Sequence, residues 1–414
     1  MILCDGLPPL RICLDARLHD GQHGGVQQVV IGLATALSAL EPDDEQYHFL
    51  VTPEAGRWIR PWLGGACQML EAPEPRRVRR PGRMLREWRA RAGASFVRVP
   101  TSDGTIERAG IDVMHFTVQT AFRTSVPSVY HPHDLQHLHM PHLFDPRELA
   151  ERTATYRQHC LDARIVVALS TWGQRDVMQA YGLTEDRVRV VPNAPVLGAY
   201  RAPTAANLTD TRRRLSLPAR YLFYPAATWP HKNHIALLDA MALLRDRDRL
   251  AIPLVCSGLQ TDHFSAIAAH VDARGLTDQV QFVGWVNTLD LRGLYAGAHA
   301  LVFPSLFEGF GIPVAEAFEA RVPVACSNVT CLPDLARGAA ELFDPADVND
   351  MAGAIARVWG NTVVRGQLAS RARSRVGDFS WDRSARLLRA HYRRIANRPL
   401  NDEDQALLSA PAPL

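Results

Sequence analysis

Short apolar runs alternate along the chain with longer stretches in which apolar residues recur at helical spacing. This alternation is typical of parallel β-sheets covered by helices, because their strands are buried on both faces. In the first half, the runs predict strands at residues 11–15, 48–52, 112–116, 128–131 and 165–169. In the second half, they predict strands at residues 221–224, 254–256, 280–283, 300–303 and 322–325. The pattern therefore predicts two consecutive doubly wound α/β domains.

The boundary between the two series is a stretch rich in Pro, Ala, Thr and Asn at residues 192–218, which we interpret as a linker. The 414 residues exceed the roughly 250–300 that one hydrophobic core usually serves, so length alone favours two domains. We place the domains at residues 1–200 and 201–380, and we expect a frayed tail at residues 398–414. Because ligands of such sheets bind beyond the carboxyl ends of the strands, we expect the chemistry there.

Composition excludes several classes of function. The formal net charge of +3 is too small for bulk nucleic-acid binding. No apolar run approaches the ~18 residues of a membrane span, and residues 1–5 lack the pattern of a secretion signal. The seven cysteines are scattered without a C-x-x-C pair, which fits a reducing compartment. We therefore expect a cytoplasmic protein with no nucleic acid among its partners.

One strongly basic segment, residues 74–98, stands apart from this balance. Met84, Leu85 and Trp88 are interleaved there with arginines: Arg76, Arg77, Arg79, Arg80, Arg83, Arg86, Arg89 and Arg91. The simpler interpretation is a solvated helix or loop. The alternative is an interfacial helix that docks on anionic lipid, where each basic residue contributes about 1 kcal/mol. The sequence leaves both interpretations open.

The stretch at residues 303–317 combines an expected anion site with two carboxylates. A strand ends near Ser305, a Gly-containing turn follows, and Pro313 suits the first turn of a helix. Free N–H groups at such a helix start suit a diphosphate. Glu308 on the turn and Glu316 one helical turn further would repel phosphate, so we interpret them as acceptors for sugar and ribose hydroxyls. The simpler interpretation of a lone Glu there is a favourable contact with the helix dipole.

A single lysine, Lys232, is present among the 46 Lys and Arg residues. It follows Pro230 and His231, in the loop after the first predicted strand of the second domain. An ammonium is a compact point charge that fits between phosphate oxygens, whereas a guanidinium is a wide planar fork. This difference favours Lys232 as a diphosphate ligand.

A cluster of histidines offers a different chemistry. Asp134 lies among five of them: His131, His133, His137, His139 and His142. Two H-x-H pairs could bind Zn²⁺ in a hydrolase. No second cluster with ligand spacing follows later in the chain, so the zinc hydrolase is the second choice.

The pattern P-S-x-x-E-G-F-G-x-P-x-x-E-A at residues 304–317 resembles the donor-site signature of retaining GT-B glycosyltransferases, specifically glycosyltransferase family 4. Supporting pieces occur in the family's order, among them residues 131–134, 190–193, 230–233, 283–286 and 332–334. The resemblance covers residues 11–396. It implies two Rossmann-like domains that face each other across a cleft, with a final helix at about residues 381–397 that returns to the first domain.

The resemblance also implies roles for individual residues of the second domain. Glu316 would hold the ribose hydroxyls, and Lys232 would neutralise the diphosphate. Glu308 would face the donor sugar and the diphosphate, together with the backbone of the next four residues: Gly309, Phe310, Gly311 and Ile312.

Three residues of the first domain complete the implied site. Gly24 and Gly25 would approach the diphosphate, and His133 would face the transferring sugar. Catalysis would therefore rest on His133, Lys232 and Glu308. One departure stands out, because the family commonly has an Arg where this chain has Ala226. A phosphate partner is missing at that position or comes from elsewhere.

The resemblance implies transfer of a hexose, with retention of configuration, from a UDP- or GDP-linked sugar to a sugar or lipid-linked acceptor. It implies neither a metal nor another cofactor. The family often acts in cell-envelope or extracellular polysaccharide or glycolipid synthesis, which would place the protein in the cytoplasm or on the inner membrane face. A non-catalytic sugar-nucleotide-binding protein remains the third hypothesis.

Overall fold

The structure, a computed structural model, describes residues 7–21, 24–41, 43–54, 56–72, 97, 99–200 and 202–412. The arginines from Arg76 to Arg91 lie outside the described residues. The chain divides into two compact units. Unit 1 comprises Met1–Ala168, Gln174–Val191 and Asp382–Pro411, and unit 2 comprises Leu169–Gly173, Pro192–Trp381 and Ala412–Leu414.

Unit 1 is built on a seven-stranded parallel sheet with the order β3-β2-β1-β4-β5-β6-β7. Its strands are β1 (Leu10–Asp15), β2 (Glu45–Val51), β3 (Cys67–Glu71), β4 (Val113–Phe116), β5 (Ser128–Tyr130), β6 (Ile165–Ala168) and β7 (Val188–Val190). Its helices are α1 (Gly24–Ala39), α3 (Thr105–Arg108), α4 (Gln136–His139), α5 (Pro146–Asp162), α6 (Thr171–Tyr181), α15 (Trp381–Ile395) and α16 (Asp402–Ser409).

Unit 2 is built on a six-stranded parallel sheet with the order β10-β9-β8-β11-β12-β13. Its strands are β8 (Leu222–Pro225), β9 (Leu254–Ser257), β10 (Val280–Gly284), β11 (Ala300–Phe303), β12 (Val324–Ser327) and β13 (Glu341–Phe343). Its helices are α7 (Ala205–Arg214), α8 (His234–Arg247), α9 (Phe264–Ala273), α10 (Thr288–Gly297), α11 (Ile312–Glu319), α12 (Leu332–Ala336), α13 (Val348–Gly360) and α14 (Thr362–Val376).

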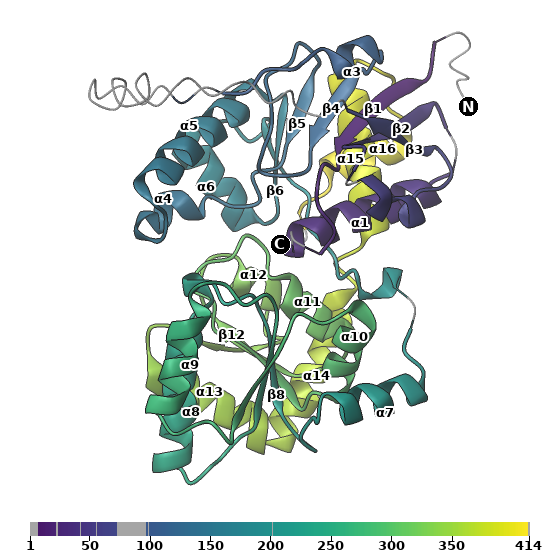
Figure 1. Cartoon of the computed structure of the whole chain (residues 1–414). Helices are drawn as coiled ribbons and strands as arrows, with labels where there is room; N and C mark the ends of the chain where they lie inside the picture. Colours follow the sequence, from purple (N-terminus) through teal and green to yellow (C-terminus); the bar gives the residue numbers. More distant parts are fainter. Residues whose placement is uncertain are drawn as a thin grey trace. The chain divides into compact units, whose positions relative to one another are not determined.

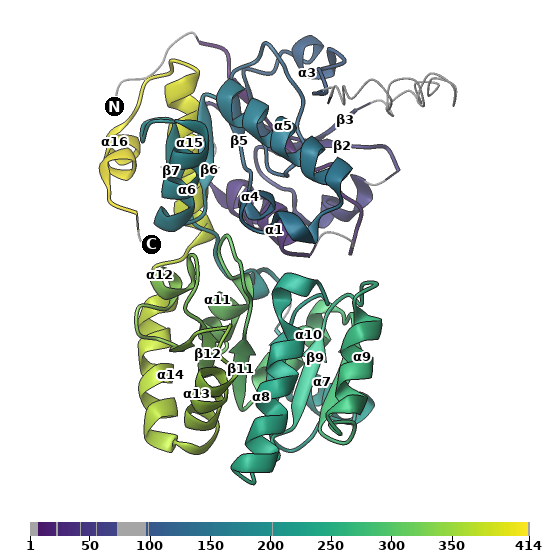
Figure 2. The same cartoon turned by 90° about the vertical axis from the view of Figure 1, so that its left-hand side faces the viewer.

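Helices cover both faces of each sheet (Figures 1 and 2), which explains why the central strands are continuous apolar runs. Every residue of β4 and of β11 is buried. The direction of strand order reverses between β1 and β4 in unit 1, and between β8 and β11 in unit 2. Loops that follow these strands therefore diverge at the carboxyl edge, where open α/β sheets bind their ligands.

Each of the ten strands predicted from the sequence overlaps a strand of the structure. Three strands were not predicted: β3, β7 and β13. All three lie at sheet edges, where one side of the strand lacks a neighbour and the apolar pattern is short. The edge strand β3, for example, has an exposed Gln68 within it.

Two expectations about irregular segments are wrong. The expected linker contains α7, which begins at a capping box of Thr204 and Asn207. The expected frayed tail contains α16, which begins at a capping box of Asn401 and Asp404. Asp404 is fully buried and accepts a hydrogen bond of 2.7 Å from Arg393 of α15, so the tail belongs to the core of unit 1.

The described helices include none that combines the length and the apolar character needed to cross a membrane.

Candidate functional site

An ion pair joins the two loops that flank the reversal point of unit 2. The Nζ atom of Lys232, after β8, lies 2.5 Å from Oε1 of Glu308, after β11. The side chains are only 19% and 12% exposed, respectively. The two residues are far apart in sequence, and the adjacency of β8 and β11 in the sheet brings them together. A cation and a carboxylate thus meet where the fold favours ligand binding.

Backbone hydrogen bonds fix these loops to each other. The N–H of Leu306 donates to the carbonyl of His231 at 2.8 Å. The hydroxyl of Tyr224, from β8 itself, donates to the carbonyl of Lys232 at 2.5 Å. Both bonds act next to the ion pair, so the ammonium is held in a defined position without a substrate.

The start of α11 presents unused donors. Among the described residues, the backbone N–H groups of Gly309, Phe310, Gly311 and Ile312 find no hydrogen-bond acceptor. Gly311, the residue before the helix, has a φ of 95°, and a Cβ there would lie 2.7 Å from a side-chain atom of Leu332. Glycine is therefore required twice, by conformation and by space. Free N–H groups and the positive end of the helix dipole form an anion site.

Glu316 lies deeper in the same helix. It is 5% exposed, and its Oε2 accepts a hydrogen bond of 2.7 Å from the hydroxyl of Tyr295 on α10. Burial raises the pKa of the Glu316 carboxyl from 4.5 to about 7, although the Tyr295 hydrogen bond opposes the rise. Tyr295 was not predicted, because a Tyr at an apolar position of a helix carries no sequence signal for a polar contact.

Ala226 occupies the position where the family commonly has an arginine. Its backbone N–H, directly after β8, donates to the carbonyl of Ser257 of β9 at 2.8 Å. The cation that pairs with the loop after β11 is the Lys232 ammonium. Lys232 and the amides of the α11 start are therefore the cationic and donor groups that the structure brings together here.

The predicted residues of unit 1 follow β1 and β5, which flank β4 in the sheet. Gly24 begins α1 with a φ of 45°, and both Gly24 and Gly25 are exposed. His133 has a φ of 67°, a left-handed conformation that is uncommon for a side chain of its size. Its Nε2 lies 2.8 Å from the carbonyl oxygen of Thr117, which follows β4. Both predicted groups thus lie at the carboxyl edge of unit 1.

The five clustered histidines do not form a metal site. No group of three or more metal-ligating side chains converges in the described residues. His139 instead pairs with Asp176 at 2.7 Å. His137 packs against the ring of Tyr156, and His142 is exposed. The arrangement therefore contradicts the zinc-hydrolase alternative.

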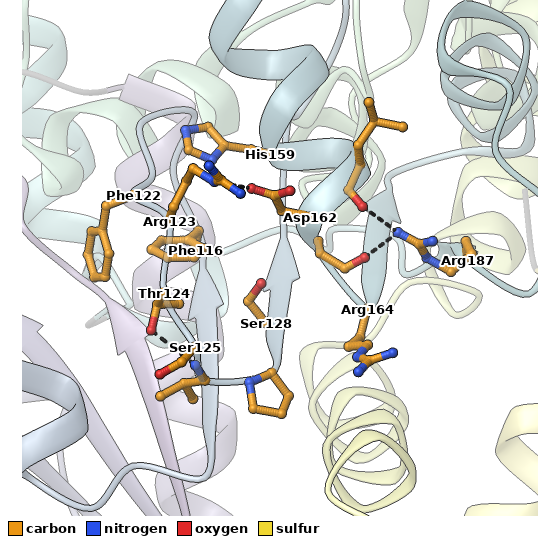
Figure 3. Close-up of a pocket in the computed structure, with 14 residues that line it drawn as sticks. Phe116, Phe122, Arg123, Thr124, Ser125, Ser128, His159, Asp162, Arg164 and Arg187 are labelled. Atoms are coloured by element: carbon orange, nitrogen blue, oxygen red, sulfur yellow. Dashed lines mark hydrogen bonds and ion pairs between the residues drawn. The ribbon is translucent and has the colours of Figure 1, made fainter. Parts of the chain in front are cut away.

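A cavity of about 320 Å³ opens near the amino-terminal ends of β5, β6 and β7 in the unit 1 sheet (Figure 3). Arg123 and Asp162 pair there at 2.9 Å, and Arg187 donates to the carbonyls of Leu161 and Ala163. None of the predicted site residues lines this cavity. It lies away from the edge where ligands of such sheets bind.

Two family models match successive parts of the chain. "Glycosyltransferase Family 4" matches residues 23–194, and "Glycosyl transferases group 1" matches residues 211–375. The chain belongs to glycosyltransferase family 4.

The relatives of this chain include bacterial glycosyltransferases whose names state different acceptors. O-antigen chain mannosyltransferase B of Escherichia coli is 28% identical over 53% of this chain and 58% of its own length. The D-inositol 3-phosphate glycosyltransferase of a Nocardioides species is 30% identical over 66% of this chain and 63% of its own length. The match thus spans less than two thirds of either relative.

Solved structures of glycosyltransferases confirm the predicted fold. HepE of Anabaena in complex with UDP and glucose aligns over 92% of this chain and 99% of its own, with a TM-score of 0.69 and 17% identity. The sucrose-phosphate synthase of Thermosynechococcus elongatus aligns over 93% and 99%, with a TM-score of 0.68 and 20% identity. The chain has the GT-B fold. Family membership also accounts for the return of α15 to unit 1.

Proposed function

We propose that this family 4 member transfers a hexose from a nucleoside-diphosphate sugar to a hydroxyl group of an acceptor. The observation that carries the proposal is the Lys232–Glu308 ion pair at the reversal point of the unit 2 sheet, where Glu308 directly precedes four N–H groups that have no acceptor among the described residues. Breaking the sugar–diphosphate bond leaves negative charge on the diphosphate. Donors fixed in advance around developing charge are the strongest single source of rate enhancement in many enzymes.

The reaction follows from this arrangement. The bond between the anomeric carbon and the diphosphate oxygen breaks through an oxocarbenium-like transition state. The acceptor oxygen bonds to the same carbon on the same face, and the acceptor proton passes to an oxygen of the leaving diphosphate. Configuration is retained, as expected for family 4, and no protein nucleophile is needed. Lys232 and the α11 amides supply the charge that Mg²⁺ supplies elsewhere, so we propose that the reaction needs neither a metal nor another cofactor.

Glu308 changes its partner during this cycle. In the structure its carboxylate pairs with Lys232, which keeps a half-buried ammonium neutralised before a donor arrives. When the diphosphate binds, it takes over the ammonium as the more highly charged anion. The Glu308 carboxylate then becomes an acceptor for hydroxyl groups of the sugar, while Glu316 accepts from the ribose hydroxyls. Gly24, Gly25 and His133 contribute from unit 1.

The choice of donor and acceptor is supported by the relatives. The matched relatives include O-antigen and serotype-specific mannosyltransferases of Escherichia coli, and the structure of HepE of Anabaena is of its complex with UDP and glucose. We propose a UDP- or GDP-linked hexose as donor and a sugar or lipid-linked acceptor of cell-envelope polysaccharide synthesis. We also propose docking on an anionic membrane surface through the arginines from Arg76 to Arg91, which lie outside the described residues.

A panel of nucleotide sugars tests the proposal. UDP-, GDP- and ADP-linked hexoses are added separately, and the melting temperature is measured, because a bound donor raises stability by mass action. The stabilising donor is then incubated with lipid-linked and free sugar acceptors, and product is detected by mass spectrometry. Glu316→Ala should abolish the stabilisation, whereas Glu319→Gln, an exposed change on the same helix, should preserve it. Donor binding without any transfer would favour the non-catalytic sugar-nucleotide-binding protein.

A further inference from the structure

The His133 imidazole is joined to the backbone by one hydrogen bond. Its backbone has a φ of 67°, and non-glycine residues in this region persist only where the surroundings enforce it. The Nε2 atom contacts the carbonyl of Thr117 at 2.8 Å. A carbonyl can only accept, so Nε2 carries the proton and Nδ1 of the neutral ring is the acceptor. Nδ1 has no hydrogen-bond partner among the described residues. It is also not one of the fully enclosed side-chain nitrogens, so it remains accessible.

Two further histidines stack behind this ring. The centroids of the His131 and His133 rings are 4.4 Å apart, and the ring planes differ by 6°. The centroid of the His115 ring, on β4, lies 6.0 Å from that of His131, and the planes of these two rings differ by 19°. Nδ1 of His115 lies 2.6 Å from the hydroxyl of Tyr392 on α15. The stack therefore runs from the returning helix of unit 1 to its carboxyl edge.

Packing alone does not explain this choice of residues. His131 is 3% exposed, and neither of its ring nitrogens has a hydrogen-bond partner in the described part of the chain. Buried polar atoms without partners reduce stability, so a purely apolar ring would suit a merely structural position better. Burial lowers the pKa of His133 to about 4 and that of His115 to about 3. All three rings are neutral near pH 7, which avoids repulsion within the stack.

We propose that the His115–His131 stack is a positioning device that holds the His133 ring with its Nδ1 acceptor available to a hydroxyl group of the transferred sugar. The proposal rests on the proposed glycosyl transfer. His131 and His115 act through His133 and do not touch substrate themselves. The chemical consequence is a preference for a donor sugar that offers a hydroxyl donor at the position facing Nδ1.

A double-mutant cycle tests the coupling through turnover. His131→Ala should lower kcat about ten- to a hundredfold, the cost of a misplaced contact group, with the donor KM changed less than about threefold. Because His131 acts through His133, the pair His131→Ala with His133→Ala should lose no more than His133→Ala alone. His131→Phe keeps a stacked ring and should retain most of the turnover, which guards against a misfolded alanine variant.

His137 provides a matched control. It is 1% exposed, packs against Tyr156 and has an Nε2 without a partner in the described part of the chain. His137→Ala combined with His133→Ala should therefore lose the product of the two separate losses. The same multiplicative loss for His131→Ala with His133→Ala would overturn the proposal.

Nitrogen NMR makes the test independent of glycosyl transfer. Long-range ¹H–¹⁵N correlations at pH 7 should show His133 in the Nε2–H tautomer in the wild type and in His137→Ala. In His131→Ala, the spectrum should show a mixture of tautomers. A wild type that gives these spectra and transfers no sugar would refute the proposed function and leave the positioning intact. A single unchanged tautomer in His131→Ala, or a mixture in the wild type, would refute the positioning.

Discussion

Replacing Glu316 by Gln should stabilise unit 2 and weaken its binding of a nucleotide sugar. The folded pKa of about 7 lies above the ordinary 4.5, so the folded state favours the protonated form. The stability that this carboxyl contributes is present below pH 4.5 and is lost as the pH rises to about 7. A difference of roughly 2.5 in pKa corresponds to about 3 kcal/mol. The Gln side chain does not titrate. The difference in stability between Glu316→Gln and the wild type should therefore be larger at pH 8 than at pH 4, by up to about 3 kcal/mol in favour of the variant.

Donor binding should show the opposite preference. A ribose hydroxyl donates most strongly to an ionised carboxylate, and about one Glu316 carboxyl in ten is ionised at pH 6 if its pKa is about 7. The Kd of the wild type for a nucleotide sugar should therefore fall about tenfold between pH 6 and pH 8. The Kd of Glu316→Gln should not change with pH over this range. Glu316→Ala, which keeps no acceptor, should bind about 1.5–3 kcal/mol more weakly than the wild type at pH 8.

The measurement must isolate unit 2, because two compact units need not unfold together. Hydrogen exchange of peptides from β11 and β12 reports the opening of unit 2 alone. A nucleotide sugar is preferable to a free nucleotide, since its esterified phosphates do not titrate near pH 6. Asp246→Asn, an exposed change on α8 of the same unit, is the control. A wild-type Kd that is constant from pH 6 to pH 8, with no stabilisation of Glu316→Gln, would refute the assignment of Glu316 to the ribose.

Three further predictions follow from the proposed function and from the basic segment. Lys232→Arg preserves the charge and should lower turnover about a hundredfold, because the wider guanidinium cannot place its N–H groups where the ammonium lies. Near wild-type turnover in steady-state assays would show that the ammonium is not at the leaving group. Turnover should survive exhaustive chelation. A loss of turnover that Zn²⁺ restores would indicate a metal site at the clustered histidines. Replacing Arg76, Arg77, Arg79 and Arg80 by Gln should weaken sedimentation with anionic vesicles, and a wild type that ignores vesicles at low salt would favour the solvated segment.

The residues of the donor half could be predicted from sequence because they lie within short contiguous patterns. Lys232 stands out as the single lysine, and Glu308 and Glu316 lie on one turn–helix segment. Their mutual arrangement could not be predicted in the same way. The Lys232–Glu308 pair depends on the adjacency of β8 and β11, which is a property of sheet order. Tyr295, the partner of Glu316, comes from a neighbouring helix without any motif.

The missed parts of the fold have a common cause, namely a weak apolar pattern. Helix α7 is largely polar, and it packs on α10 where Gly293 lets Thr211 approach; a Cβ at Gly293 would lie 3.0 Å from the Thr211 side chain. Helix α16 is fixed by the buried contact between Asp404 and Arg393. In both cases the structure contains a capping box, but Asn207 and Asp404 occupy the third helical position, where the sequence pattern of a capping box has Glu or Gln.

Three costs to stability lie at the carboxyl edges of the two sheets. Glu316 is a buried carboxyl with a raised pKa, His133 has a left-handed backbone, and His131 has two unpartnered nitrogens among the described residues. Folding alone would favour an apolar residue at positions 316 and 131, and glycine at position 133. Such residues are maintained against stability where binding or catalysis requires them. At the ligand-binding edge of the GT-B fold, these three residues are therefore the ones whose cost to stability a glycosyl-transfer function would explain.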